Sequence, residues 1–126
     1  MVTTEIAQLN RECNAWRETL RSYRDEFGQL KNRLQDVAGR QVKRDVLLEI
    51  EHLDNQLHIQ LINIHDLKHA IKTHSRQIEN ETASNNGNLP EELLGYHENL
   101  FDEYQSLEHT LHELRGEFDH FVNRTQ

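Results

Sequence analysis

The amino-acid sequence predicts an all-α fold, an antiparallel up-down-up three-helix bundle with coiled-coil (heptad) packing. Apolar residues recur at alternating spacings of three and four along nearly the whole chain, the pattern of a helix that buries one narrow seam. One proline and five glycines among 126 residues leave room for few turns. The balance of 35% hydrophobic and 29% charged residues suits a thin bundle better than a globular sandwich. We therefore expect a single domain over residues 1–126.

The first predicted helix covers about residues 4–38. Its seam of apolar residues is unbroken, and Gly39 follows it as an expected C-cap. Trp16, the sole tryptophan, lies on this seam and is expected to anchor the core. The seam consists of Ile6, Leu9, Cys13, Trp16, Leu20, Tyr23, Phe27, Leu30, Leu34 and Val37.

The second predicted helix covers about residues 42–83, and two of its seam positions are polar, Gln60 and His74. The other seam residues are Val46, Ile50, Leu53, Leu57, Ile64, Leu67, Ile71 and Ile78. Because buried polar groups are almost always hydrogen-bonded, we expect Gln60 to bond a tyrosine, either Tyr23 of its own layer or Tyr104 one step away. A buried amide of this kind would also specify one register.

The third predicted helix covers about residues 89–124 and follows the turn-forming stretch ASNNGN at 83–88. Asn88 is the expected cap, with Pro90 and Glu91 in the first turn. Its seam carries one polar residue, His97, among Leu93, Leu100, Tyr104, Leu107, Leu111, Leu114, Phe118 and Phe121. Short connections make neighbouring helices run antiparallel.

Charged residues that flank the seams predict which helix faces which, and therefore the handedness of the bundle. Basic residues beside the first seam and acidic residues beside the third suggest that these two helices meet through those rows. The expected pairs are Arg17–Glu103, Lys31–Glu117, Arg33–Glu49 and Asp54–Arg115.

The plan of three long helices with a tryptophan in the first resembles spectrin-type three-helix modules, in architecture only. No family motif accompanies this common pattern, so the resemblance implies a bundle and no particular activity.

Composition limits the function classes. A net charge of −8 gives no basic surface for a nucleic acid or an anionic membrane. No apolar run approaches the roughly 20 residues of a membrane span, and the amino terminus lacks the pattern of a signal peptide. With a single cysteine, no intramolecular disulfide can form. We expect a cytoplasmic protein that is not an enzyme and has no evident small-molecule substrate.

The candidate metal ligands are Cys13, His74 and His97. Stacking the three seams in register places His74 and His97 in adjacent layers, with Cys13 in the layer of His97. Cysteine and histidine are zinc ligands, so a core zinc site is one interpretation. The other is that the histidines bond each other and the cysteine fills space, since no seam carboxylate offers the ligands a second shell. A Cys-His nucleophile is not expected, because burial raises the pKa of a thiol.

Other histidines fall on outward positions. His65, Asp66 and His69 are helical neighbours that could hold a metal ion in part, but we expect them to form a solvated face.

The candidate partner surface consists of apolar residues that the seams do not need. These are Leu48, Ile59, Ile62, Leu94 and Phe101. The expected function is a non-enzymatic protein–protein interaction or self-association module with a protein partner or a homodimer. The alternative is a metal-binding or pH-responsive bundle that uses the core cysteine and histidines.

Overall fold

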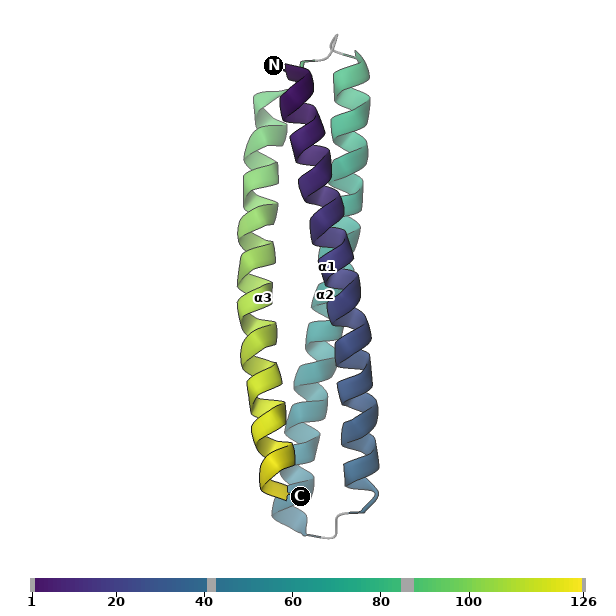
Figure 1. Cartoon of the computed structure of the whole chain (residues 1–126), viewed down its shortest axis with the longest axis vertical. Helices are drawn as coiled ribbons and strands as arrows, with labels where there is room; N and C mark the ends of the chain where they lie inside the picture. The colour runs from purple at the N-terminus through teal and green to yellow at the C-terminus, as the bar shows by residue number, and fades with distance from the viewer. Residues whose placement is uncertain (1, 41–42, 85–87, 126) are drawn as a thin grey trace.

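The computed structural model describes residues 2–40, 43–84 and 88–125, without the side chains of residues 2–5. Its three helices are α1 (Val2–Ala38), α2 (Arg44–Ser84) and α3 (Glu91–Thr125). Helices α1 and α3 run in one direction and α2 runs in the other, so the two chain ends lie at opposite ends of the rod (Figure 1). The predicted all-α, antiparallel three-helix bundle is confirmed.

The helix boundaries differ from the sequence prediction by up to two residues. Helix α3 begins at Glu91 because the Pro90 carbonyl accepts the N–H groups of Leu93 and Leu94, at 3.1 and 3.4 Å. The expected cap, Asn88, therefore lies two residues before the carbonyl that starts the helix. Gly39 follows α1 as expected, and its N–H donates to the Gln35 carbonyl at 3.1 Å. The predicted start of the second helix near residue 42 and turn residues 85–87 lie outside the described residues.

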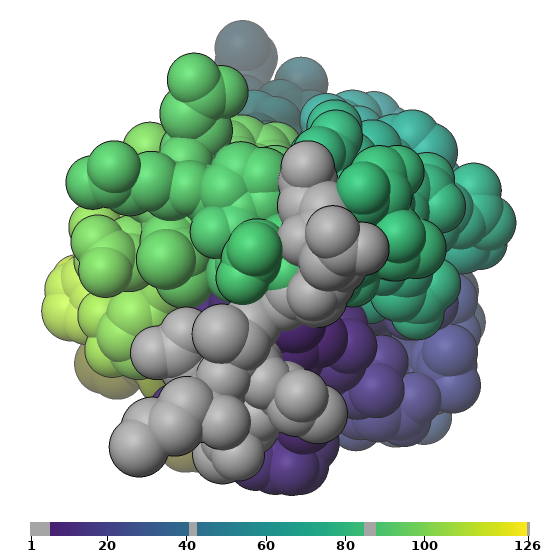
Figure 2. Space-filling view, turned by 90° about the horizontal axis from the view of Figure 1, so that it is seen from above, coloured from purple at the N-terminus to yellow at the C-terminus, as the bar shows by residue number. Residues whose placement is uncertain are grey.

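The three seams meet in one continuous core. Seam positions are buried without exception from Leu9 to Leu34 in α1, from Ile50 to Ile78 in α2 and from His97 to Phe121 in α3. Burying one large apolar side chain contributes about 1.5–3 kcal/mol, so these rows supply the main stabilising free energy. In the end-on view the helices occupy three sectors around this axis, with α1 purple, α2 teal and α3 green (Figure 2).

The predicted handedness was wrong. Lys31 of α1 bonds Asp54 of α2 at 2.7 Å, where the sequence suggested a partner on α3. Arg115 of α3 bonds Glu26 of α1, where the sequence suggested Asp54. Each helix therefore faces each neighbour through the flank opposite to the one that the sequence suggested. The inter-helix ion pairs between acidic residues and Lys or Arg in the described chain are Lys31–Asp54, Glu26–Arg115 and Glu49–Arg124.

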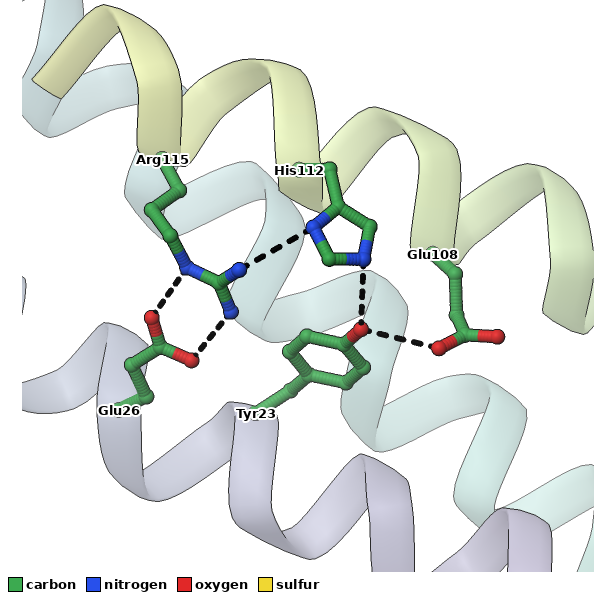
Figure 3. Close-up of polar contacts among 5 residues, drawn as sticks. All are labelled: Tyr23, Glu26, Glu108, His112 and Arg115. Atoms are coloured by element: carbon green, nitrogen blue, oxygen red, sulfur yellow. Dashed lines mark hydrogen bonds and ion pairs between the residues drawn. The ribbon is translucent and has the colours of Figure 1, made fainter.

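A polar network joins α1 and α3 in this arrangement (Figure 3). The Arg115 guanidinium binds the Glu26 carboxylate through two bonds of 2.5 and 2.6 Å, and it also donates to Nδ1 of His112 at 3.1 Å. Because guanidinium groups only donate, the proton of His112 sits on Nε2 and is donated to the Tyr23 oxygen at 3.3 Å. The Tyr23 hydroxyl in turn donates to Glu108 at 2.9 Å.

Aromatic packing explains why the charge pattern was a poor guide to handedness. The ring of Phe101 stacks on Trp16 with centroids 5.6 Å apart, and Val122 is buried on the same flank of α3. Exposed ion pairs contribute only about 0.2–1 kcal/mol each, which is too little to choose the handedness of the bundle. Complementary charges could also be found for either handedness. The apolar flank of α3 decides which side faces α1.

Gln60 also differs from its prediction. Its Oε1 accepts a bond from Nδ2 of Asn63, one turn away on α2, at 3.1 Å, and not from a tyrosine. Tyr23 is instead engaged by Glu108 and His112 on the far side of the core. None of the described helices is long and apolar enough to cross a membrane.

Candidate functional sites

The structure brings Cys13, His74 and His97 together, one from each helix. His74 Nε2 lies 3.0 Å from His97 Nδ1, and Cys13 Sγ lies 3.9 Å from the same Nδ1 atom. All three donor atoms lie within 4.8 Å of one another. The layer stacking deduced from the sequence is the cause, because it sets these seam positions at neighbouring heights. We call these residues the Cys-His-His cluster.

A carboxylate completes the arrangement behind His97. Glu12 of α1 places Oε2 3.2 Å from Nε2 of His97, on the opposite edge of the ring from the cluster. A carboxylate accepts, so this Nε2 carries the proton and His97 Nδ1 presents a lone pair to the cluster. Glu12 is partly buried, and its neighbour in the sequence is Cys13.

Aromatic rings hold the two imidazoles in place. The Trp16 ring lies 4.8 Å from that of His97, and the Tyr96 ring meets His74 edge-on at 5.1 Å. Cys13 and His74 are fully buried and His97 is 5% exposed. The donor atoms are therefore positioned by rigid neighbours and shielded from bulk water.

Burial sets the protonation of the cluster. It raises the pKa of the Cys13 thiol to about 11, with a further contribution from Glu12 and an opposing one from Arg17. It also lowers the pKa of His74 to about 4, helped by His97. Cys13 is thus a thiol and His74 a neutral ring at neutral pH. The expected raised pKa of the thiol is confirmed, which argues against a Cys-His nucleophile.

The outward histidines are exposed, as the heptad assignment predicts. His65, Asp66 and His69 all lie on the solvent side of α2. On α3, His109 Nε2 pairs with Glu113 at 2.7 Å, with both side chains well exposed. Such pairs along one helix are ordinary surface contacts.

The five candidate partner residues are exposed, but they do not form one patch. Leu48, Ile59 and Ile62 are the most exposed, at 56%, 46% and 47%, and lie on the outer face of α2. Leu94 and Phe101 lie on α3, on the flank that faces α1, and Phe101 is engaged by Trp16. The most exposed apolar side chains available to a partner are therefore those of α2.

A groove with a volume of about 550 Å³, which was not predicted from the sequence, lies between α2 and α3. Leu67 and Leu107 form its apolar floor, and Asp66 and Glu103 stand on its two rims. The groove is present because the flanks facing each other are small or polar. Its lining residues are Gln60, Asn63, Asp66, Leu67, Ala70, Glu103, Ser106, Leu107 and Thr110. The repeated small side chains could have indicated it.

No family model matches the chain, and neither does any curated protein or solved structure. The function has to be argued from these two sites.

Proposed function

We propose that the chain is a non-enzymatic protein-interaction module, which binds an amphipathic, basic helix of a protein partner in the α2–α3 groove. The observation that carries the proposal is the groove itself, with leucines on its floor and a carboxylate on each rim. A three-helix bundle that adds a helix in such a groove becomes a four-helix bundle, a common and stable packing.

The apolar part of the groove suits helix-in-groove recognition. A docked helix places side chains spaced by three or four residues on apolar positions, here Leu67 and Leu107, while Ala70 leaves room for its backbone. Ile59 is four residues before Asn63 of the lining, so it lies on the same face of α2, and Ile62 borders it. Their exposed side chains extend the apolar surface by about one turn.

The charge of the groove favours a basic partner. Asp66 and Glu103 have no basic residue among the groove's lining side chains. From residue 88 onward the chain carries nine acidic residues and two basic ones, so the field on the α3 side is negative. Complementary charge accelerates association and fixes orientation. The proposed setting is the cytoplasm, where the lone Cys13 stays reduced.

The test uses a synthetic amphipathic peptide with leucines at helical spacing and lysines on both flanks, titrated into isotope-labelled chain. We expect backbone amide resonances lining the groove to shift, and a matched peptide with glutamates for lysines to have no effect. Reversing the rim charges with D66K and E103K should weaken binding of the basic peptide. Filling the groove with A70R should abolish it, whereas A15R, at an exposed position on α1, should not.

Two results would count against the proposal. Peptide-induced shifts that persist in the A70R variant would place binding elsewhere. A concentration-dependent dimer in sedimentation, lost in I59S/I62S, would assign the α2 face to a second copy of the chain instead.

A further inference from the structure

We infer that the Cys-His-His cluster is a binding site for a borderline-soft transition-metal ion such as Zn²⁺, with Glu12 as a positioning residue behind His97. This inference does not depend on the proposed partner groove. The groove is lined by residues 60–70 and 103–110, whereas the cluster is formed by Cys13, His74 and His97.

The donor set and its spacing suit such an ion. Zn²⁺ binds cysteine sulfur at about 2.3 Å and histidine nitrogen at about 2.0–2.1 Å, so ligand atoms of a tetrahedral site lie about 3.3–3.7 Å apart. The nitrogen–nitrogen distance of 3.0 Å and the sulfur–nitrogen distance of 3.9 Å bracket this range. Since all three donor atoms lie within 4.8 Å of one another, the widest pair has to close by about one ångström to seat an ion.

The sequence argued against a metal site because no carboxylate on the seams could support the ligands. Glu12, which lies beside the seam, supplies that carboxylate. Metal-binding histidines usually donate their second ring N–H to a carboxylate, which fixes the ring and makes the ligating nitrogen more basic. Glu12 accepts from Nε2 of His97 at 3.2 Å, so Nδ1 of His97 is the ligating atom. Trp16 packs against the same ring at a tilt of 33° and restricts its movement.

Packing alone does not account for the two buried rings. His97 Nδ1 is an acceptor, so in the metal-free chain His74 must donate its Nε2 proton to it. His74 Nδ1 then remains buried with no hydrogen-bond partner among the described residues. Buried polar atoms of this kind are uncommon, and the histidine pair is therefore not a closed network. Nor does the pair explain why the single cysteine of the chain lies beside it.

Coordination has defined chemical consequences. The Cys13 thiol binds as the thiolate and gives up one proton to solvent. His74 moves its own proton from Nε2 to Nδ1, which has no acceptor among the described residues in either state. Three protein donors leave a fourth position for a water molecule or a small anion. A hollow of about 520 Å³ lies at this end of the bundle, and its lining includes Thr73, Gln77 and Tyr96, whose ring also contacts His74.

The experiment is a titration of metal-free chain with Co²⁺, which reports coordination through absorption where Zn²⁺ is silent. We expect one equivalent to bind, with a near-ultraviolet thiolate-to-cobalt charge-transfer band and visible bands typical of tetrahedral geometry. Zn²⁺ should displace the Co²⁺. Since Cys13 is the only cysteine among 126 residues, the charge-transfer band alone assigns the sulfur ligand.

Variants separate the core site from the surface. C13S should lose the charge-transfer band and the one-to-one binding, while H65A/H69A, which removes the exposed histidine pair, should retain both. E12Q should keep the band but weaken Co²⁺ binding by about 10- to 100-fold. Far-ultraviolet circular dichroism checks that each variant is folded.

Several outcomes would overturn the inference. These are a folded wild-type chain that binds no Co²⁺, binding without the charge-transfer band, or stoichiometric binding that disappears in H65A/H69A. Unchanged affinity in E12Q would remove the positioning role of Glu12.

Discussion

The network between α1 and α3 predicts that ionisation of Tyr23 contributes to a loss of stability of the bundle in alkali. Tyr23 is 7% exposed, and burial together with its bond to Glu108 raises its pKa from 10.0 to about 12, against an opposing effect of Arg115. In the unfolded chain the hydroxyl ionises near pH 10, so the folded state is favoured fully below that pH and progressively less up to pH 12. This shift of about two pKa units corresponds to a loss of about 3 kcal/mol in the free energy of unfolding between pH 10 and pH 12. That is a large part of the 5–15 kcal/mol typical of small proteins.

Urea unfolding between about pH 8 and pH 12, followed by circular dichroism, measures this loss. We expect Y23F to be about 1 kcal/mol less stable at neutral pH, because the hydroxyl bonds to Glu108 and His112 are lost. Its free energy of unfolding should then fall less steeply in alkali. Y96F, at an exposed ring, is the matched control and should keep the wild-type slope. Cys13 and Tyr104, whose pKa values burial also raises, account for the slope that remains in Y23F. An alkaline slope in Y23F equal to that of the wild type would refute the reasoning.

Two further predictions concern the core and the handedness. Leu57 is fully buried, so L57A should cost about 2–5 kcal/mol in denaturant unfolding, whereas L48A on the exposed face should change stability by less than about 0.5 kcal/mol; equal effects would contradict the assigned core. In a double-mutant cycle, Glu26 and Arg115 should show a coupling energy of about 0.5–1.5 kcal/mol, while Asp54 and Arg115 should show none. A coupling energy between Asp54 and Arg115 would contradict this handedness and support the opposite one.

The sequence determined the elements of this fold well because one physical rule covers almost the whole chain. An uninterrupted spacing of threes and fours can only be satisfied by a helix with one buried face, and the turn-rich residues separate three such stretches. Residues as unlike as Gln60 and His97 were placed in the core by position alone, and both are buried. Boundaries were less certain because Asn88 and Pro90 both suit a helix start.

Handedness could not be read from the sequence because the charged residues fit either arrangement of the flanks. Each seam has two flanks, both rich in charges, and Asp54 can reach Lys31 or Arg115 depending on which flank is used. The residues that decide between the two are Phe101 and Val122, which are packed on the same flank of α3. Phe101 looks like an excess surface hydrophobic until Trp16 is placed beside it. The same reasoning shows why Phe101 was assigned to a partner surface although its ring is stacked within the molecule.

Glu12 illustrates where reasoning by heptad positions stops. It lies one residue before a seam position, and that flank is usually solvated, so the sequence offered no reason to connect it with a histidine on the third helix. The connection requires the handedness that brings this flank of α1 against α3. The same handedness pairs Glu26, two heptads further along α1, with Arg115. A bundle of the opposite hand would have the same Cys13, His74 and His97 layers but no carboxylate behind His97. The metal-binding inference is therefore linked to the handedness, and the Glu26–Arg115 coupling tests a structural premise on which the role of Glu12 depends.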